Sequence, residues 1–113
     1  MRRNRYKLVL RFGPRVEKER FATLDEALEG LAARLPSVSR RDTVGALMRD
    51  YGPEQQVAGR LELHGPLGTH GGVDVRGDGS ATPYLGWIRK QPVEARPGES
   101  PVDALRRELE GDG

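Results

Sequence analysis

The chain has 113 residues, of which 35% are hydrophobic and 32% charged, and its formal net charge is +2. This length suits one domain with a modest core. The sequence has no cysteine, which excludes disulfides, thiolate metal sites and thiol nucleophiles. The apolar run from Leu8 to Leu10 is too short for a signal peptide or a membrane span. We therefore expect a cytoplasmic protein that does not enter a membrane.

Two strands and two helices are predicted in the first half of the chain. Apolar residues alternate with polar ones over residues 6–12, and a Gly-Pro turn leads to a second, more polar strand over 16–22. Residues 23–35 have an apolar stripe at helical spacing after a Thr-x-x-Glu capping box, and Pro36 is expected to end that helix. The pattern in residues 39–53 predicts a second helix.

Three strands and a helix are predicted in the second half. Residues 56–64 alternate again, with Arg60, Glu62 and His64 on the polar side. A loop over 65–72 should lead to a short strand at 73–76, a Gly-rich turn at 77–79 and a longer strand within 83–94. The last helix is expected over 101–110, because Ser100 can cap it and Pro101 suits its first position.

These elements predict a small α+β domain over residues 1–113, in the order β-β-α-α-β-β-β-α. We expect an antiparallel sheet of about five strands with the helices packed on one face. Residues 1–5 are expected to form a flexible basic arm, and residues 94–100 a loop that leads to the last helix. That helix is free to dock on the domain or on a partner.

The residues that carry catalytic or metal chemistry are sparse. The two histidines, His64 and His70, lack the local spacing of a metal site even with Asp74, and we expect both to be solvated. Carboxylates and serines fall at caps, turns and strand faces, without an acid-base pair or a nucleophile elbow. Arg76-Gly77-Asp78 lies at a hairpin signal and is interpreted as a turn. We expect no enzyme, no cofactor and no metal.

Charge is distributed unevenly along the chain. Residues 1–20 hold eight basic and two acidic side chains, whereas residues 94–113 have a net charge of −3. A basic arm that continues into a strand favours contacts with DNA or RNA phosphates. The segment around Trp87 places aromatic residues next to cations, a pattern typical of base stacking beside backbone contacts. The candidate nucleic-acid-binding residues are Arg2, Arg3, Arg5, Lys7, Arg11, Trp87, Arg89 and Lys90.

The hairpin-then-helix order of residues 6–31, with the junction Phe-x-Thr-x-x-Glu-Ala, resembles the small arm-DNA-binding domains at the start of tyrosine recombinases. The resemblance implies a sheet that meets DNA. It covers about the first third of the chain, and no recombinase catalytic region follows. The resemblance does not assign this chain to that family.

A second hypothesis is a protein–protein interaction module without nucleic-acid binding. Exposed strand edges can pair between copies, and an amphipathic C-terminal helix can complete a partner's core. The basic first strand and the acidic C-terminal segment could also meet between neighbouring copies. The sequence does not decide between a homo-oligomer and a different protein partner. It also leaves open whether Trp87 lies in the core or on the surface.

Overall fold

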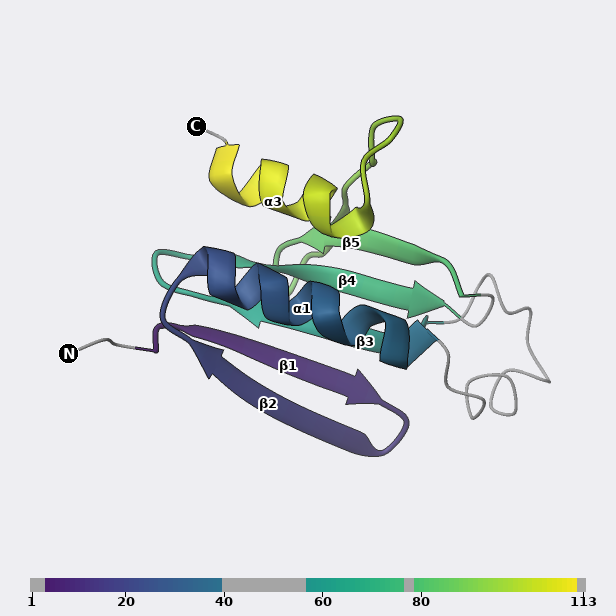
Figure 1. The fold of residues 1–113 in the computed structure, drawn as a ribbon, viewed down its shortest axis with the longest axis horizontal. Helices are drawn as coiled ribbons and strands as arrows, with labels where there is room; N and C mark the ends of the chain where they lie inside the picture. Colours follow the sequence, from purple (N-terminus) through teal and green to yellow (C-terminus); the bar gives the residue numbers. More distant parts are fainter. Residues whose placement is uncertain (1–3, 40–56, 77–78, 112–113) are drawn as a thin grey trace.

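A computed structural model describes residues 4–39, 57–76 and 79–111. These ranges form a layer of strands and a layer of helices (Figure 1). The elements in chain order are β1 (Tyr6–Phe12), β2 (Arg15–Phe21), α1 (Leu24–Ser39), β3 (Val57–His64), β4 (His70–Arg76), β5 (Ala81–Leu85), β6 (Gln91–Pro92) and α3 (Pro101–Gly111).

The strands form a six-stranded sheet in the order β2-β1-β3-β4-β5-β6, in which every neighbouring pair is antiparallel. The predicted α+β class with an antiparallel sheet is confirmed. The prediction of one long strand within residues 83–94 was wrong, because Gly86 adopts a positive φ of 101° and turns the chain there. The segment folds into the β5–β6 hairpin, which gives six strands in place of about five.

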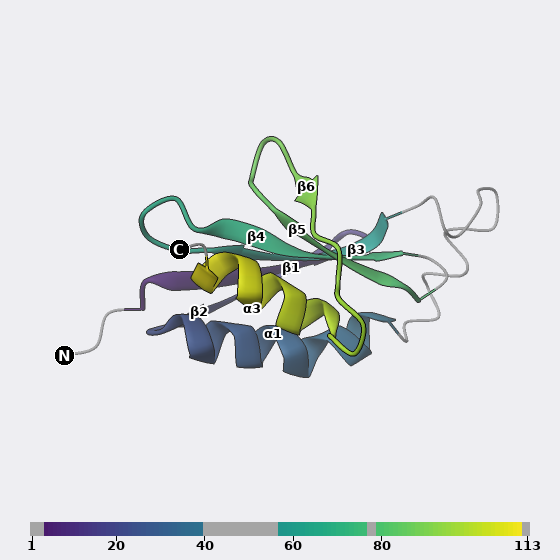
Figure 2. The same cartoon turned by 90° about the horizontal axis from the view of Figure 1, so that it is seen from above.

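Both described helices lie on the same face of the sheet, as the sequence predicts, and the β5–β6 hairpin rises on the opposite side (Figure 2). α1 packs on β1, β2 and β3, and α3 packs on β4 and β5. The core fills the space between the two layers, where alternate strand residues meet the helix stripes. The largest fully buried side chains are Leu8, Leu28, Leu31, Leu61, Leu63, Leu105, Val38, Val73 and Val75.

Both helices begin at the predicted caps. The Thr23 hydroxyl accepts a hydrogen bond from the Glu26 backbone N–H at 3.1 Å, and the Glu26 carboxylate accepts one from the N–H of Ala22. The Ser100 hydroxyl accepts from the N–H of Asp103 at 3.0 Å, and the Asp103 carboxylate accepts from the N–H of Ser100. These side chains satisfy N–H groups that the first helical turn leaves without partners.

α1 does not end at Pro36, and this prediction was wrong. The helix continues to Ser39 with Pro36 inside it. Proline removes the hydrogen bond to the carbonyl four residues earlier, at Ala32, but both residues lie on the exposed side, where water can reach that carbonyl. The extra turn buries Val38, whose side chain packs against Gly59 of β3. Burial of Val38 offsets the lost hydrogen bond.

The C-terminal helix docks on its own domain. Leu105 and Ala104 are fully buried, and the Arg106 guanidinium pairs with Asp25 of α1. Arg107 pairs with Glu99, whose pKa is lowered to about 2 by this hydrogen bond and by one from the N–H of Arg96. The predicted helix over residues 39–53 lies largely outside the described ranges, because residues 40–56 are not described. Among the described helices, none is long and apolar enough to cross a membrane.

Candidate functional site

The sheet face opposite the helices, here called the open face, collects most of the polar strand residues. The strand register places residues of equal orientation side by side: Lys7 of β1 pairs with His64 of β3, which pairs with His70 of β4. In the described ranges no helix covers this face (Figure 2). Its side chains include Lys7, Val9, Arg11, Val16, Lys18, Arg20, Arg60, Glu62, His64, His70, Asp74, Thr82 and Tyr84.

The β1–β2 hairpin separates charges between the two faces of the sheet. Lys18 and Arg20 of β2 pair with Val9 and Lys7 of β1 and so lie on the open face. The acidic residues of β2 alternate with them and point to the helix side, where Arg34 of α1 pairs with Glu19. Of the basic residues in β1 and β2, Lys7, Arg11, Lys18 and Arg20 therefore lie on the open face, and Arg15 lies on the helix side.

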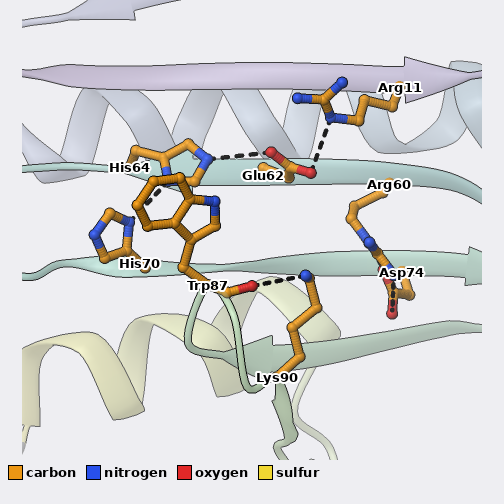
Figure 3. Close-up of polar contacts among 8 residues, drawn as sticks. All are labelled: Arg11, Arg60, Glu62, His64, His70, Asp74, Trp87 and Lys90. Atoms are coloured by element: carbon orange, nitrogen blue, oxygen red, sulfur yellow. Dashed lines mark hydrogen bonds and ion pairs between the residues drawn. The ribbon is translucent and has the colours of Figure 1, made fainter.

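Trp87 lies on the surface, which answers the question left open by the sequence. It is 58% exposed, and the β5–β6 turn holds its ring over the two histidines (Figure 3). The Gly86 N–H donates to the carbonyl of His70 at 2.9 Å, and Lys90 donates to the carbonyl of Trp87 at 2.8 Å. A Cβ at Gly86 would collide with the carbonyl oxygen of Arg89, so this tight turn requires glycine.

His64 and His70 form a pair, and the prediction that both are solvated was wrong. β4 begins at His70 rather than at residue 73, which brings the two imidazoles opposite each other. Their Nδ1 atoms are 2.8 Å apart, and the Trp87 ring stacks on His70 with centroids 5.1 Å apart. Partial burial and the neighbouring charge of His64 lower the pKa of His70 below 6.5.

Glu62 is a buried carboxylate at the centre of the open face. Its Oε2 lies 3.0 Å from Nε of Arg11 and its Oε1 lies 3.1 Å from Nε2 of His64 (Figure 3). Burial alone would raise the pKa of Glu62, but the hydrogen bond from His64 and the charge of Arg11 lower it below 4.5. Glu62 is therefore ionised at neutral pH and fixes the side chains on both sides of it.

Tyr84 lies across β4 beside Glu62. It can do so because Gly72, the residue between them in the sheet, has no side chain: a Cβ there would lie 2.7 Å from the Tyr84 hydroxyl. The guanidinium of Arg60 and the ammonium of Lys90 lie 5.7 and 5.8 Å from the Tyr84 ring centroid. Burial raises the pKa of Tyr84, so the phenol stays neutral at physiological pH.

A shallow groove of about 320 Å³ runs between Trp87 and the β1–β2 hairpin, here called the open-face groove. Val9 lines it and is itself buried. Three cations and one carboxylate contribute to its walls, so the groove is positive even with neutral histidines. The lining residues are Lys7, Val9, Arg11, Lys18, Glu62, His64, His70 and Trp87.

The structure brings three of the predicted nucleic-acid-binding residues to the groove: Lys7, Arg11 and Trp87. Arg5 is exposed just before β1, and Arg89 is exposed in the β5–β6 turn outside the groove lining. Lys90 holds the carbonyl of Trp87 and so supports the turn. Arg2 and Arg3 lie outside the described residues.

The sequence interpretation left out groove residues that the register brings in. Lys18 follows from the β1–β2 hairpin: a turn at Gly13-Pro14 with alternating strands places it beside Val9. Glu62 and the histidines need the β1–β3 and β3–β4 registers, which no local pattern supplies. Lys18, Glu62 and His64 each lie on the polar side of a predicted strand, whereas His70 fell in the predicted loop over residues 65–72.

The histidine pair alone does not make a metal centre. Within the described residues, no group of three or more His, Cys, Asp or Glu side chains could hold a metal ion. Asp74, the third residue considered from the sequence, pairs with Arg60 at 2.5 Å instead of approaching the histidines. Comparisons with protein-family models, curated proteins and solved structures give no significant match to this chain.

Proposed function

We propose that the open face binds single-stranded nucleic acid, with a base stacked against Trp87 and phosphates contacted by cations of β1 and β2. The observation that carries the proposal is a half-exposed tryptophan beside a row of cations on a sheet face without a covering helix in the described ranges. Aromatic platforms next to positive grooves are the common design of proteins that bind single strands.

Stacking favours a single strand over a duplex. The exposed ring of Trp87 can contact the face of a base only where that face is not already stacked on its neighbours. The inner side of the ring already rests on His70, and the hydrogen bond from Gly86 to His70 fixes the turn. A ring held in place loses little conformational freedom when a base binds.

Phosphate contacts come from the side chains that the β1–β2 hairpin gathers. Lys7, Arg11, Lys18 and Arg20 lie on two adjacent strands, so a backbone that crosses β1 and β2 meets several of them. Each neutralised phosphate releases counter-ions, and the affinity should fall with salt by a slope of about 0.7 per contact for single strands. Arg5 lies next to this row in sequence and can extend it.

The protein–protein alternative is supported less well by the edges of the sheet. β2 is a seven-residue edge strand, but its exposed residues are mostly charged, as in natural edges that resist pairing. The other edge, β6, has only two residues. A mass measurement by light scattering tests this alternative: a dimer that does not bind nucleic acid would favour it over our proposal.

The test of the proposal is fluorescence anisotropy of the full chain with labelled single strands and duplexes of about 12 nucleotides at two salt concentrations. We expect single strands to bind more tightly than duplexes and salt to weaken both. Trp87→Ala should weaken single-strand binding about tenfold through the lost stacking. Equal affinity of this variant and the natural chain would contradict the stacking role.

A matched pair of charge reversals separates the open face from general electrostatics. Lys18→Glu changes the open face, whereas Arg96→Glu makes the same change in the exposed segment between β6 and α3. We expect Lys18→Glu to weaken binding severalfold and to lower the salt slope by about one. Equal losses from both variants would mean that net charge, rather than this surface, governs binding.

A further inference from the structure

Glu62 is a buried carboxylate in the lining of an otherwise cationic groove. It is 8% exposed, and no other charged side chain of the described residues is buried to this degree. A purely cationic surface would grip phosphates better without a carboxylate at its centre. The position of Glu62 instead suits a group that reads a base, since specificity comes from buried polar atoms that must be satisfied.

The carboxylate lines the groove and retains hydrogen-bonding capacity. Two carboxylate oxygens offer about four acceptor sites, and Arg11 and His64 occupy one each. The guanidinium of Arg11 has five N–H donors, of which Nε–H is bound to Glu62. The pair thus presents acceptors and donors next to one another.

The surroundings leave room for a flat group above this pair. Val9 on β1 flanks Glu62 on one side and has a short side chain, whereas Tyr84 fills the place above Gly72 of β4 on the other side. Trp87 forms a wall of the same groove, whose volume of about 320 Å³ is at the small end of ligand sites. Trp87 and Glu62 line the same groove, so a base bound there would lie against both.

From this arrangement we infer that the groove selects guanine. Guanine has two adjacent donors on its Watson–Crick edge, N1–H and the N2 amino group, which match the two oxygens of the Glu62 carboxylate. Its O6 acceptor then faces the Arg11 guanidinium. Adenine and cytosine place a lone pair beside a single amino donor, and uracil has one donor between two acceptors, so each would set an acceptor against the carboxylate. This inference rests on the proposed function.

The alternative is a purely structural role, in which Glu62 only holds Arg11 and His64 in place. A holding role would affect strands of every sequence equally, so the readout is the ratio of affinities rather than the affinity itself. The experiment uses the full chain and uracil strands of about 12 nucleotides that carry one central guanine, adenine, cytosine or inosine. Inosine lacks the N2 amino group and removes one of the two proposed hydrogen bonds.

We expect the guanine strand to bind about tenfold more tightly than the adenine and cytosine strands, with inosine between them. Glu62→Gln keeps the shape but replaces one acceptor by a donor, and should bring the four affinities together. Asp74→Asn is the control, because Asp74 is also a carboxylate of the open face but lies outside the groove lining. It should strengthen all four strands alike and leave their ratio unchanged.

Equal binding of all four strands to the natural chain would overturn the guanine inference and leave the proposed function standing. A guanine preference that persists in Glu62→Gln would also overturn it. If no strand binds, the proposed function itself is contradicted. A strand with N1-methylguanine needs no protein variant: it should lose the preference on the natural chain even if Glu62→Gln does not fold.

Discussion

The two faces of the sheet are made from alternate residues of the same strands, yet they differ in burial and in charge. On the helix side, β1 places Leu8 and Leu10 in a core where almost nothing is exposed. On the open face, the same strand places Lys7 and Arg11 around a positive groove. One face supplies the apolar side chains of the core between the sheet and the helices, whereas the other collects the charged side chains, with Val9, Glu62 and Tyr84 buried among them.

The largest effect should come from neighbours in β1 that point to opposite faces. Leu8→Ala removes a fully buried side chain and should lower the free energy of unfolding by about 2 to 5 kcal/mol. Lys7→Ala should change it by less than about 0.5 kcal/mol but weaken nucleic-acid binding. Urea denaturation and anisotropy on both variants check this. A large loss of stability in Lys7→Ala would show that the open face also supports the fold.

The helix-side face is the part of the fold that the sequence predicts best. The alternation in residues 6–12 and the apolar stripe of the capped helix are local patterns. Each predicted its element correctly, because the spacing of apolar residues in the sequence follows from the burial of one face of a strand or helix. The break at Gly86 and the continuation past Pro36 were missed for a common reason. In each case a tertiary contact, with His70 for the turn and with Gly59 for the helix, overrides the local signal.

The open face was predicted only in part, and the reason is register. Lys7 and Arg11 were found because one strand suffices to place them together. Glu62, His64 and His70 come from two further strands, and only the pairing of β1 with β3 and of β3 with β4 makes them neighbours. Such pairings depend on contacts distant in sequence, which composition and local charge do not encode.

An intermediate effect is expected at Gly72, where the central strands leave no room for a side chain. In Gly72→Ala, the new methyl group would meet the Leu61 carbonyl and the Tyr84 hydroxyl, and such overpacking costs about 1 to 3 kcal/mol. The variant should also displace Tyr84 from its place beside Glu62. Urea denaturation measures the first effect, and the Tyr84 ring resonances report the second.

A control for that variant is Tyr84→Phe, which removes the hydroxyl and keeps the ring. We expect the loss of stability in Gly72→Ala to persist when both changes are combined, because the backbone carbonyl of Leu61 still blocks the methyl group. Full recovery in the double variant would assign the clash to the phenol alone. Unchanged stability in Gly72→Ala would show that β4 can shift away from β3, and that the close packing of the open face is not rigid.

The smallest effect is a pH dependence from the histidine pair. Because the pKa of His70 is lowered from 6.5 by burial and by His64, the unfolded chain binds a proton at this site more readily than the folded chain. The contribution to stability is therefore fully present above about pH 6.5 and is lost as the pH falls towards the lower pKa of the folded state. His70→Gln should reduce the slope of stability against pH between about 7 and 5.

Proton NMR of the imidazole separates this cause from the rest of the protein. The midpoint of the His70 titration should lie below 6.5, and Trp87→Ala should move it upwards, since removal of the indole exposes the imidazole to water. A midpoint at or above 6.5 would mean that the imidazole is as well solvated as in the unfolded chain. The stack of Trp87 on His70 would then be looser than the ring separation of 5.1 Å indicates. The affinity for a nucleic-acid strand would have to come from the phosphate contacts instead.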